Sequence, residues 1–173
     1  MTGGVDLVRQ AVIERLRSQG VRAEAAYSRA WAGRYDGAVI AVGVRGCVSA
    51  PAGLGNYLGT ERDERTGAER EVYGRRAEIT LALDTYAPRD AGAGGCLAAL
   101  ERAHDALSDG VAAGLRPGKM DWGEARFDRD SGMFLQQGSL QCDAFFLAAV
   151  EAETGLLLDF RLKGVPWIEH DGT

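Results

Sequence analysis

The fold class follows from two adjoining stretches, EVYGRRAEITLALDTYAP (Glu71–Pro88) and RDAGAGGCLAALERAHDALSDG (Arg89–Gly110). In the first, apolar residues at positions 79, 81 and 83 alternate with polar residues at 78, 80 and 84, which is typical of a strand with one buried face. In the second, apolar residues recur at helical spacing, with His104 in the apolar stripe, and Gly114 follows shortly afterwards. The pair predicts a strand followed by an amphipathic helix.

The flanking sequence predicts one more helix and several more strands. VDLVRQAVIERLRSQG (Val5–Gly20) has apolar residues along one side at helical spacing. The period of two over residues 21–28 predicts a half-exposed strand, and the nearly unbroken apolar run over residues 38–47 predicts an interior strand, with glycines that allow a bulge. Towards the C-terminus we expect two strands around the Asp130–Gly132 turn and a short strand after Gly155.

This order of elements predicts an α+β domain. Neighbouring strands joined by short turns pair antiparallel, and each helix has one apolar stripe. We therefore expect a single domain over residues 1–173, with a mostly antiparallel sheet and two helices packed on one face. A doubly wound parallel fold would need more alternation of strand and helix.

The segment Ser49–Arg70, SAPAGLGNYLGTERDERTGAER, has no sustained period and is rich in glycine and charge. We interpret it as a long mobile loop, since such loops are either solvated insertions or functional arms. In the second case Leu54, Tyr57 and Leu58 would anchor it on a partner. A C-terminal extension covers about residues 151–173.

The composition is that of a globular protein, with 46% hydrophobic and 26% charged residues. The net charge of -5 and the pI near 5.1 give no broad attraction to nucleic acid or to anionic membranes. No apolar run reaches the length of a membrane span, and the N-terminus lacks the pattern of a signal peptide, so we expect a cytosolic protein. The three cysteines are widely spaced, which favours reduced thiols.

Candidate catalytic groups are weak, and we predict no catalytic residue, no cofactor and no metal site. The glycines at 92, 94 and 95 precede a helix, where phosphate can bind, but the P-loop and dinucleotide-binding motifs are absent. Cys96 and His104 lie too far apart along one helix to form a dyad. Acidic residues at 121, 124, 128 and 130 are interpreted as solvent-facing or turn-capping groups. The alternative hypothesis is a small-ligand or phosphate-handling enzyme that uses the glycines at 92–95.

Four stretches together resemble a known family: VDLVRQAVIERLRSQG, EITLALDTYAPRDAGAGGCLAALERAHDAL, DRDSGMF and LQCDAFFLAAV, spanning about Val5 to Val150. Their order resembles that of the tail terminator proteins of long-tailed bacteriophages, the family of the phage lambda minor tail protein U. The resemblance implies a non-enzymatic virion protein, assembled in the host bacterial cytoplasm. Such a protein forms a homo-oligomeric, hexameric ring that caps the tail tube and joins it to head–tail connector proteins. The alternative within this class is a related prophage neck or tail-completion protein.

The closing stretch LQCDAFFLAAV (Leu140–Val150) is apolar on both faces in its second half. If one face lies on the helices of the domain, the other needs cover from a loop, from the C-terminal strand or from a neighbouring subunit. We therefore name Phe145 and Leu147, together with the three loop anchors, as candidate interface residues.

Overall fold

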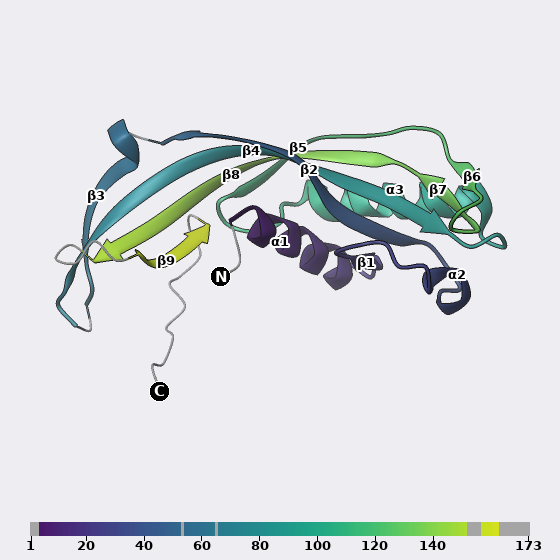
Figure 1. Cartoon of the computed structure of the whole chain (residues 1–173), viewed down its shortest axis with the longest axis horizontal. Helices are drawn as coiled ribbons and strands as arrows, with labels where there is room; N and C mark the ends of the chain where they lie inside the picture. Colours follow the sequence, from purple (N-terminus) through teal and green to yellow (C-terminus); the bar gives the residue numbers. More distant parts are fainter. Residues whose placement is uncertain (1–3, 53, 65, 152–156, 163–173) are drawn as a thin grey trace.

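The computed structural model describes residues 4–52, 54–64, 66–151 and 157–162, and these form one large sheet with two long helices against it (Figure 1). The elements follow one another as α1 (Gly4–Ser18), β1 (Ala23–Glu24), α2 (Trp31–Arg34), β2 (Val39–Pro51), the 3-10 turn η1 (Leu54–Asn56), β3 (Tyr57–Arg62), β4 (Glu69–Ala87), α3 (Gly92–Ser108), β5 (Leu115–Trp122), β6 (Arg126–Asp128), β7 (Met133–Gln136), β8 (Gly138–Glu151) and β9 (Leu157–Leu162).

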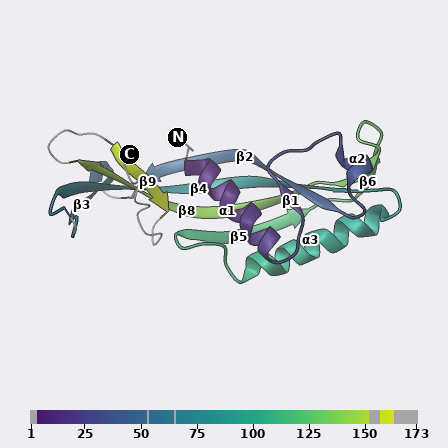
Figure 2. The same ribbon diagram turned by 90° about the horizontal axis from the view of Figure 1, so that it is seen from below.

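The long strand β4 is the centre of the sheet. It pairs antiparallel with β2 and then β3 along one edge, and with β8 and then β7 along the other. Strands β5 and β9 both pair antiparallel with β8, and the short β1 pairs parallel with β2. Helices α1 and α3 lie on the same side of the sheet (Figures 1 and 2). The predicted α+β fold, a mostly antiparallel sheet with two helices on one face, is confirmed.

The core lies between the sheet and the two helices. Val12 and Leu16 of α1 and Leu100 of α3 are fully buried against Leu81 and Leu83 of β4. The buried side of α3 consists mainly of small residues: Cys96, Ala99, Ala103 and Ala106 accompany Leu100 and Leu107. Small side chains let α3 approach the sheet closely, and the buried stripe of α3 is rotated relative to the apolar stripe predicted from the sequence. Consequently Leu97 and His104 lie at its exposed margin.

Two strand predictions differ from the structure in extent. The strand expected over residues 21–28 is reduced to Ala23–Glu24, because the next residues turn into the short α2. The strand expected as interior over residues 38–47 runs on to Pro51. It is buried only over residues 39–42 and becomes exposed from Val44, where it leaves the region that the helices cover.

The prediction of a long loop at Ser49–Arg70 is wrong. This segment contains the end of β2, η1, β3 and the first residues of β4, and β3 and β4 form a hairpin. The charges that suggested a loop lie opposite one another across this hairpin, with Glu61 opposite Arg70 and Arg62 opposite Glu69. Opposite charges at facing positions stabilise a strand pair even where neither face is apolar.

At the end that carries β3, the sheet extends past both helices (Figures 1 and 2). We call this end of the sheet the arm, and its base still packs against the helices through Ala77, Ala144 and Phe146. It comprises residues 44–51 of β2, β3, residues 69–78 of β4, residues 143–151 of β8, and β9. The predicted C-terminal strand is present as β9, which adds to the sheet beside β8, and the rest of the extension lies outside the described residues.

Candidate interaction surface

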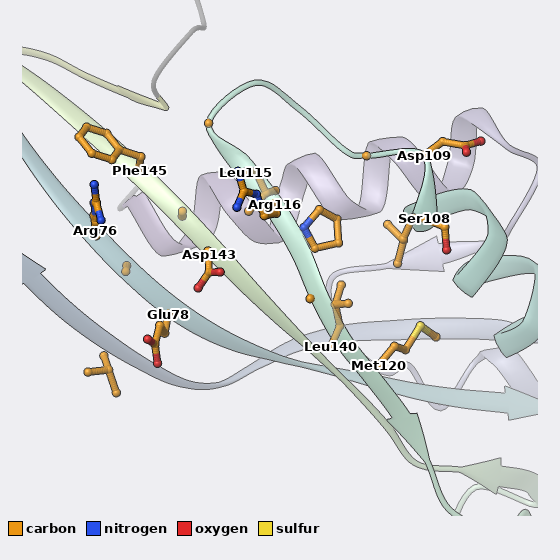
Figure 3. Close-up of a pocket in the computed structure, with 18 of the residues that line it drawn as sticks. Arg76, Glu78, Ser108, Asp109, Leu115, Arg116, Met120, Leu140, Asp143 and Phe145 are labelled. Atoms are coloured by element: carbon orange, nitrogen blue, oxygen red, sulfur yellow. The ribbon is translucent and has the colours of Figure 1, made fainter. Parts of the chain in front are cut away.

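The surface of the arm opposite α1 and α3, here called the outer face, is made of side chains that line up across neighbouring strands. Facing residues of paired strands point to the same side of a sheet. The pairing of β2, β4, β8 and β5 therefore gives two rows, Val48–Glu78–Asp143–Arg116 and Ala50–Arg76–Phe145. Figure 3 shows Arg76, Glu78, Asp143 and Phe145 on the two adjacent central strands.

A hollow of about 1170 Å³ is lined by both rows. It continues past β5 to the end of α3, where Ser108 and Asp109 border it (Figure 3). The lining alternates between apolar and charged groups, and the hollow is open to solvent. It therefore lacks the enclosed apolar walls that most small-ligand sites have.

The charges in these two rows balance. Glu78 and Asp143 lie directly opposite each other on β4 and β8, and Arg116 lies opposite Asp143 on β5. The guanidinium carbon of Arg76 lies 5.8 Å from the centre of the Phe145 ring, a cation–π arrangement. Two acids and two bases in these rows suit a protein partner with charges of both signs better than a nucleic-acid backbone, which requires an excess of positive charge.

The predicted interface residues have different surroundings. Leu58 and Phe145 come together above Gly74, where an added Cβ would lie 2.5 Å from Leu58 Cδ1 and 3.2 Å from Phe145 Cε1. Tyr57 faces the other side of the sheet, with its ring edge-on to Tyr73 at 5.7 Å. Leu58 and Tyr57 are 43% and 45% exposed.

Leu147 does not belong to an exposed patch. Its side chain is only 8% exposed within the subunit, because the second half of β8 is covered on both faces: Phe146 joins the main core on the side of the helices. Leu54 lies in η1, and its side chain is outside the described residues.

Sequence reasoning missed the most exposed large apolar residue among the side chains of the arm that the structure describes. Val48 is 70% exposed, and Val44 is 44% exposed. Val44 lies in the stretch 38–47 that the apolar run had suggested to be interior, and Val48 lies directly after it. The signal that could have located them is Pro51, because proline occurs in sheets mainly on edge strands.

The glycines of the alternative hypothesis form the first turn of α3, and none of them lines the hollow described above. Gly95 faces the end of β4: a Cβ added to it would lie 2.8 Å from the Ala91 Cβ and 3.4 Å from the Ala87 Cβ. Gly92 has φ +63°, in the left-handed region. The close approach at Gly95 and the backbone conformation at Gly92 thus give each of these glycines a role in packing or geometry.

Cys96 and His104 are separated by the fold, as expected. Cys96 is fully buried, with Sγ 3.5 Å from the carbonyl oxygens of Thr85 and Phe134, and burial raises the pKa of its thiol to about 11. A thiol with such a pKa is a poor nucleophile at neutral pH. The His104 ring is exposed and lies edge-on to Trp122 at a distance of 6.3 Å between ring centres.

The acidic residues at the β6–β7 turn act as expected for turn-capping groups. The backbone N–H of Ser131 donates to Asp128 Oδ2 at 3.1 Å. Hydrogen bonds from the side chain and the backbone of Ser131 lower the pKa of Asp128. Asp121 is exposed and accepts a hydrogen bond from the Ser139 hydroxyl at 2.9 Å. Glu124 and Asp130 are also exposed.

In the described part of the chain no group of three or more His, Cys, Asp or Glu side chains could hold a metal ion. None of the described helices has the length and apolar character needed to cross a membrane. Comparison with known proteins gave no matching family model and no matching curated sequence.

Proposed function

We propose that the protein is a structural subunit of a bacteriophage or prophage virion that acts by self-association into a ring, resembling a tail terminator that caps the tail tube and joins it to the head. The proposal assigns the outer face of the arm to contacts with neighbouring subunits. Tail-tube and connector proteins would be the other partners, and no catalytic step is involved.

The observation that carries the proposal is the arm. A sheet in a monomeric domain usually has its apolar side chains under helices or another sheet. In the arm, Val48 and Leu58 are exposed on the face opposite the two long helices, and Tyr57 is exposed on the other face. A subunit whose function is association requires such a surface, since binding buries apolar area that the free subunit leaves in water. The order of the elements, helix–strands–helix–strands, supports the virion class through its resemblance to tail terminators.

The first test is the mass of the purified protein over a concentration series, measured by sedimentation velocity and light scattering, with electron microscopy of the largest species. We expect closed rings, because repeated head-to-tail contacts close when the rotation between subunits permits. A protein that remains monomeric at high concentration and does not bind isolated tail tubes would contradict the proposal.

The second test is a matched pair of surface variants. Leu58→Asp places a charge on the arm, and Leu97→Asp places the same charge at a site on α3 with 41% exposure, close to the 43% of Leu58. We expect Leu58→Asp to abolish rings and Leu97→Asp to leave them unchanged, with both variants folded by circular dichroism. Equal effects of the two variants would show that the arm is not the contact surface.

A further inference from the structure

The part of β2 that lies in the arm has an open edge. Strand β1 pairs with β2 only at Ile40 and Ala41, and β4 occupies the opposite edge over the whole length of β2. Among the residues that the structure describes, no strand pairs with the outward edge of residues 43–51. An unpaired edge presents backbone N–H and C=O groups that can hydrogen-bond to another strand.

Two hydrogen bonds identify which backbone groups point outward. The N–H of Ile40 donates to Arg22 O on the outward side, and the N–H of Ala52 donates to Gly74 O on the side of β4. The backbone N–H and C=O groups of successive residues point to alternate edges of a strand. Before the bulge, even-numbered residues of β2 point outward; the extra residue between Val44 and Gly46 reverses this, so that odd-numbered residues point outward after it. Counting from either hydrogen bond, the backbone groups of Cys47, Ser49 and Pro51 point outward, away from β4.

The open edge is limited at both ends. The bulge next to Gly46 interrupts the regular strand at one end, and Pro51, which has no N–H, removes the outward donor at the other end. The stretch Gly46–Ala50 remains as a regular edge of five residues with two outward-pointing residues, Cys47 and Ser49. Val48 lies at its centre and is the most exposed large apolar side chain in the described part of the chain.

We propose that this stretch pairs antiparallel with the same stretch of a second copy of the chain, around a two-fold axis at Val48. In this register Cys47 forms a hydrogen-bonded pair with the partner's Ser49, and Ser49 forms one with the partner's Cys47. All outward N–H and C=O groups of the two residues are then satisfied, and neither proline lies within the paired stretch.

The side chains are self-complementary in this register. Val48 lies directly opposite the partner's Val48, so each covers the other on the outer face, and Gly46 lies opposite the partner's Ala50. Nothing within 4 Å of a Cβ built on Gly46 would exclude a side chain there, so packing within the subunit does not explain this glycine. Registers centred on Ser49 or on positions closer to Pro51 place a proline opposite an outward-pointing residue and lose hydrogen bonds.

The edge pairing does not depend on the proposed virion function. A two-fold contact joins subunits in pairs and does not by itself close a head-to-tail ring. It predicts a dimer of the free protein, which the tests of ring formation and tail binding do not require.

Disulfide trapping tests the register. In a Cys47→Ser background, Val48→Cys places two thiols directly across the two-fold axis, where Cα atoms lie about 4.5 Å apart in a non-hydrogen-bonded pair, within the range of a disulfide. Ala50→Cys is the matched control on the same face and strand. Its partner copy lies four residues away along the strands, about 13 Å, which a disulfide cannot bridge.

Under mild oxidation we expect Val48→Cys to give a covalent dimer at least ten times faster than Ala50→Cys. As a second readout, Val48→Lys should remove the two-fold dimer in sedimentation velocity, because two ammonium groups would meet at the axis, while Glu78 opposite position 48 supports the lysine within the subunit. Equal trapping of both cysteines, no trapping of either, or faster trapping at position 50 would overturn the edge pairing.

The outcomes also separate the two proposals. A protein that caps tail tubes but gives no dimer with Val48→Cys would retain the proposed function and lose the edge pairing. A Val48→Cys dimer in a protein that never forms rings or binds tails would retain the edge pairing and lose the virion function.

Discussion

Three alanine substitutions in the glycine-rich turn should affect stability with different signs. Gly94 has no atom within 4 Å of a built Cβ, so Gly94→Ala gains helix propensity without a clash and should stabilise the fold by about 0.5 to 1 kcal/mol. Gly95→Ala has the same gain, but its Cβ would meet the Ala91 Cβ at 2.8 Å. Overpacking of this kind costs about 1 to 3 kcal/mol. Gly92→Ala places a Cβ in the left-handed region at φ +63°, which costs about 1 to 2 kcal/mol.

The assay is thermal and urea unfolding of the wild type and the three variants. For a domain of this size, 1 kcal/mol corresponds to a shift in melting temperature of about 2 to 4 °C. Gly94→Ala should therefore melt roughly 3 to 9 °C above Gly95→Ala, with Gly92→Ala also below the wild type. If Gly95→Ala were as stable as Gly94→Ala, the close contact between position 95 and Ala91 would be refuted. Stabilisation of the wild type by inorganic phosphate, lost in all three variants, would instead support the phosphate-site alternative.

Two further predictions concern single side chains. At pH 8 a thiol reagent should modify only the exposed Cys47 of the folded protein, because burial raises the pKa values of the Cys96 and Cys142 thiols to about 11 and about 12. Unfolding should make all three thiols reactive. Rapid labelling of three thiols in the native state would contradict this prediction. Asp128→Asn should be less stable than the wild type at pH 7, and the difference in the free energy of unfolding should shrink as the pH falls. Hydrogen bonds from Ser131 lower the pKa of Asp128 in the folded state. The stabilisation by the carboxylate is therefore present above the pKa of the unfolded state, near pH 4, and is lost as the pH falls through the pKa of the folded state. Urea unfolding of both proteins at pH 7 and at pH 3 measures this, and a constant difference would exclude the carboxylate as its source.

The elements with strong periodicity were predictable from the sequence. Helix α1, strand β4 and helix α3 were each expected close to their observed bounds, because an amphipathic helix or a half-buried strand carries its period in its own residues. The bulge in β2 was also indicated, since glycines on either side of Arg45 permit it.

The arm was not predictable by the same reasoning. Local pattern reports whether a strand has a buried face, but the hairpin of β3 with β4 is held by facing charges and has little buried surface to reveal it. The exposure of Val48 depends on which face of the sheet the helices cover, which is a tertiary property. The same holds for Leu147: a strand that is apolar on both faces can be covered by its own subunit or by a neighbour, and only the fold distinguishes the two.

The distribution of charge along the arm bears on where association takes place. At its tip the β3–β4 hairpin has facing opposite charges, and Asp63 forms an ion pair with Arg70 at 2.5 Å. Charged side chains on a strand edge discourage pairing with other chains, because pairing would bury them. Arg45, which forms an ion pair with Asp84 at 3.1 Å, has the same effect at the base of the arm. Between these charged ends, Gly46–Ala50 is an uncharged stretch of open edge. The charged residues disfavour strand addition elsewhere on the arm, so this stretch is where a second strand can add to the sheet.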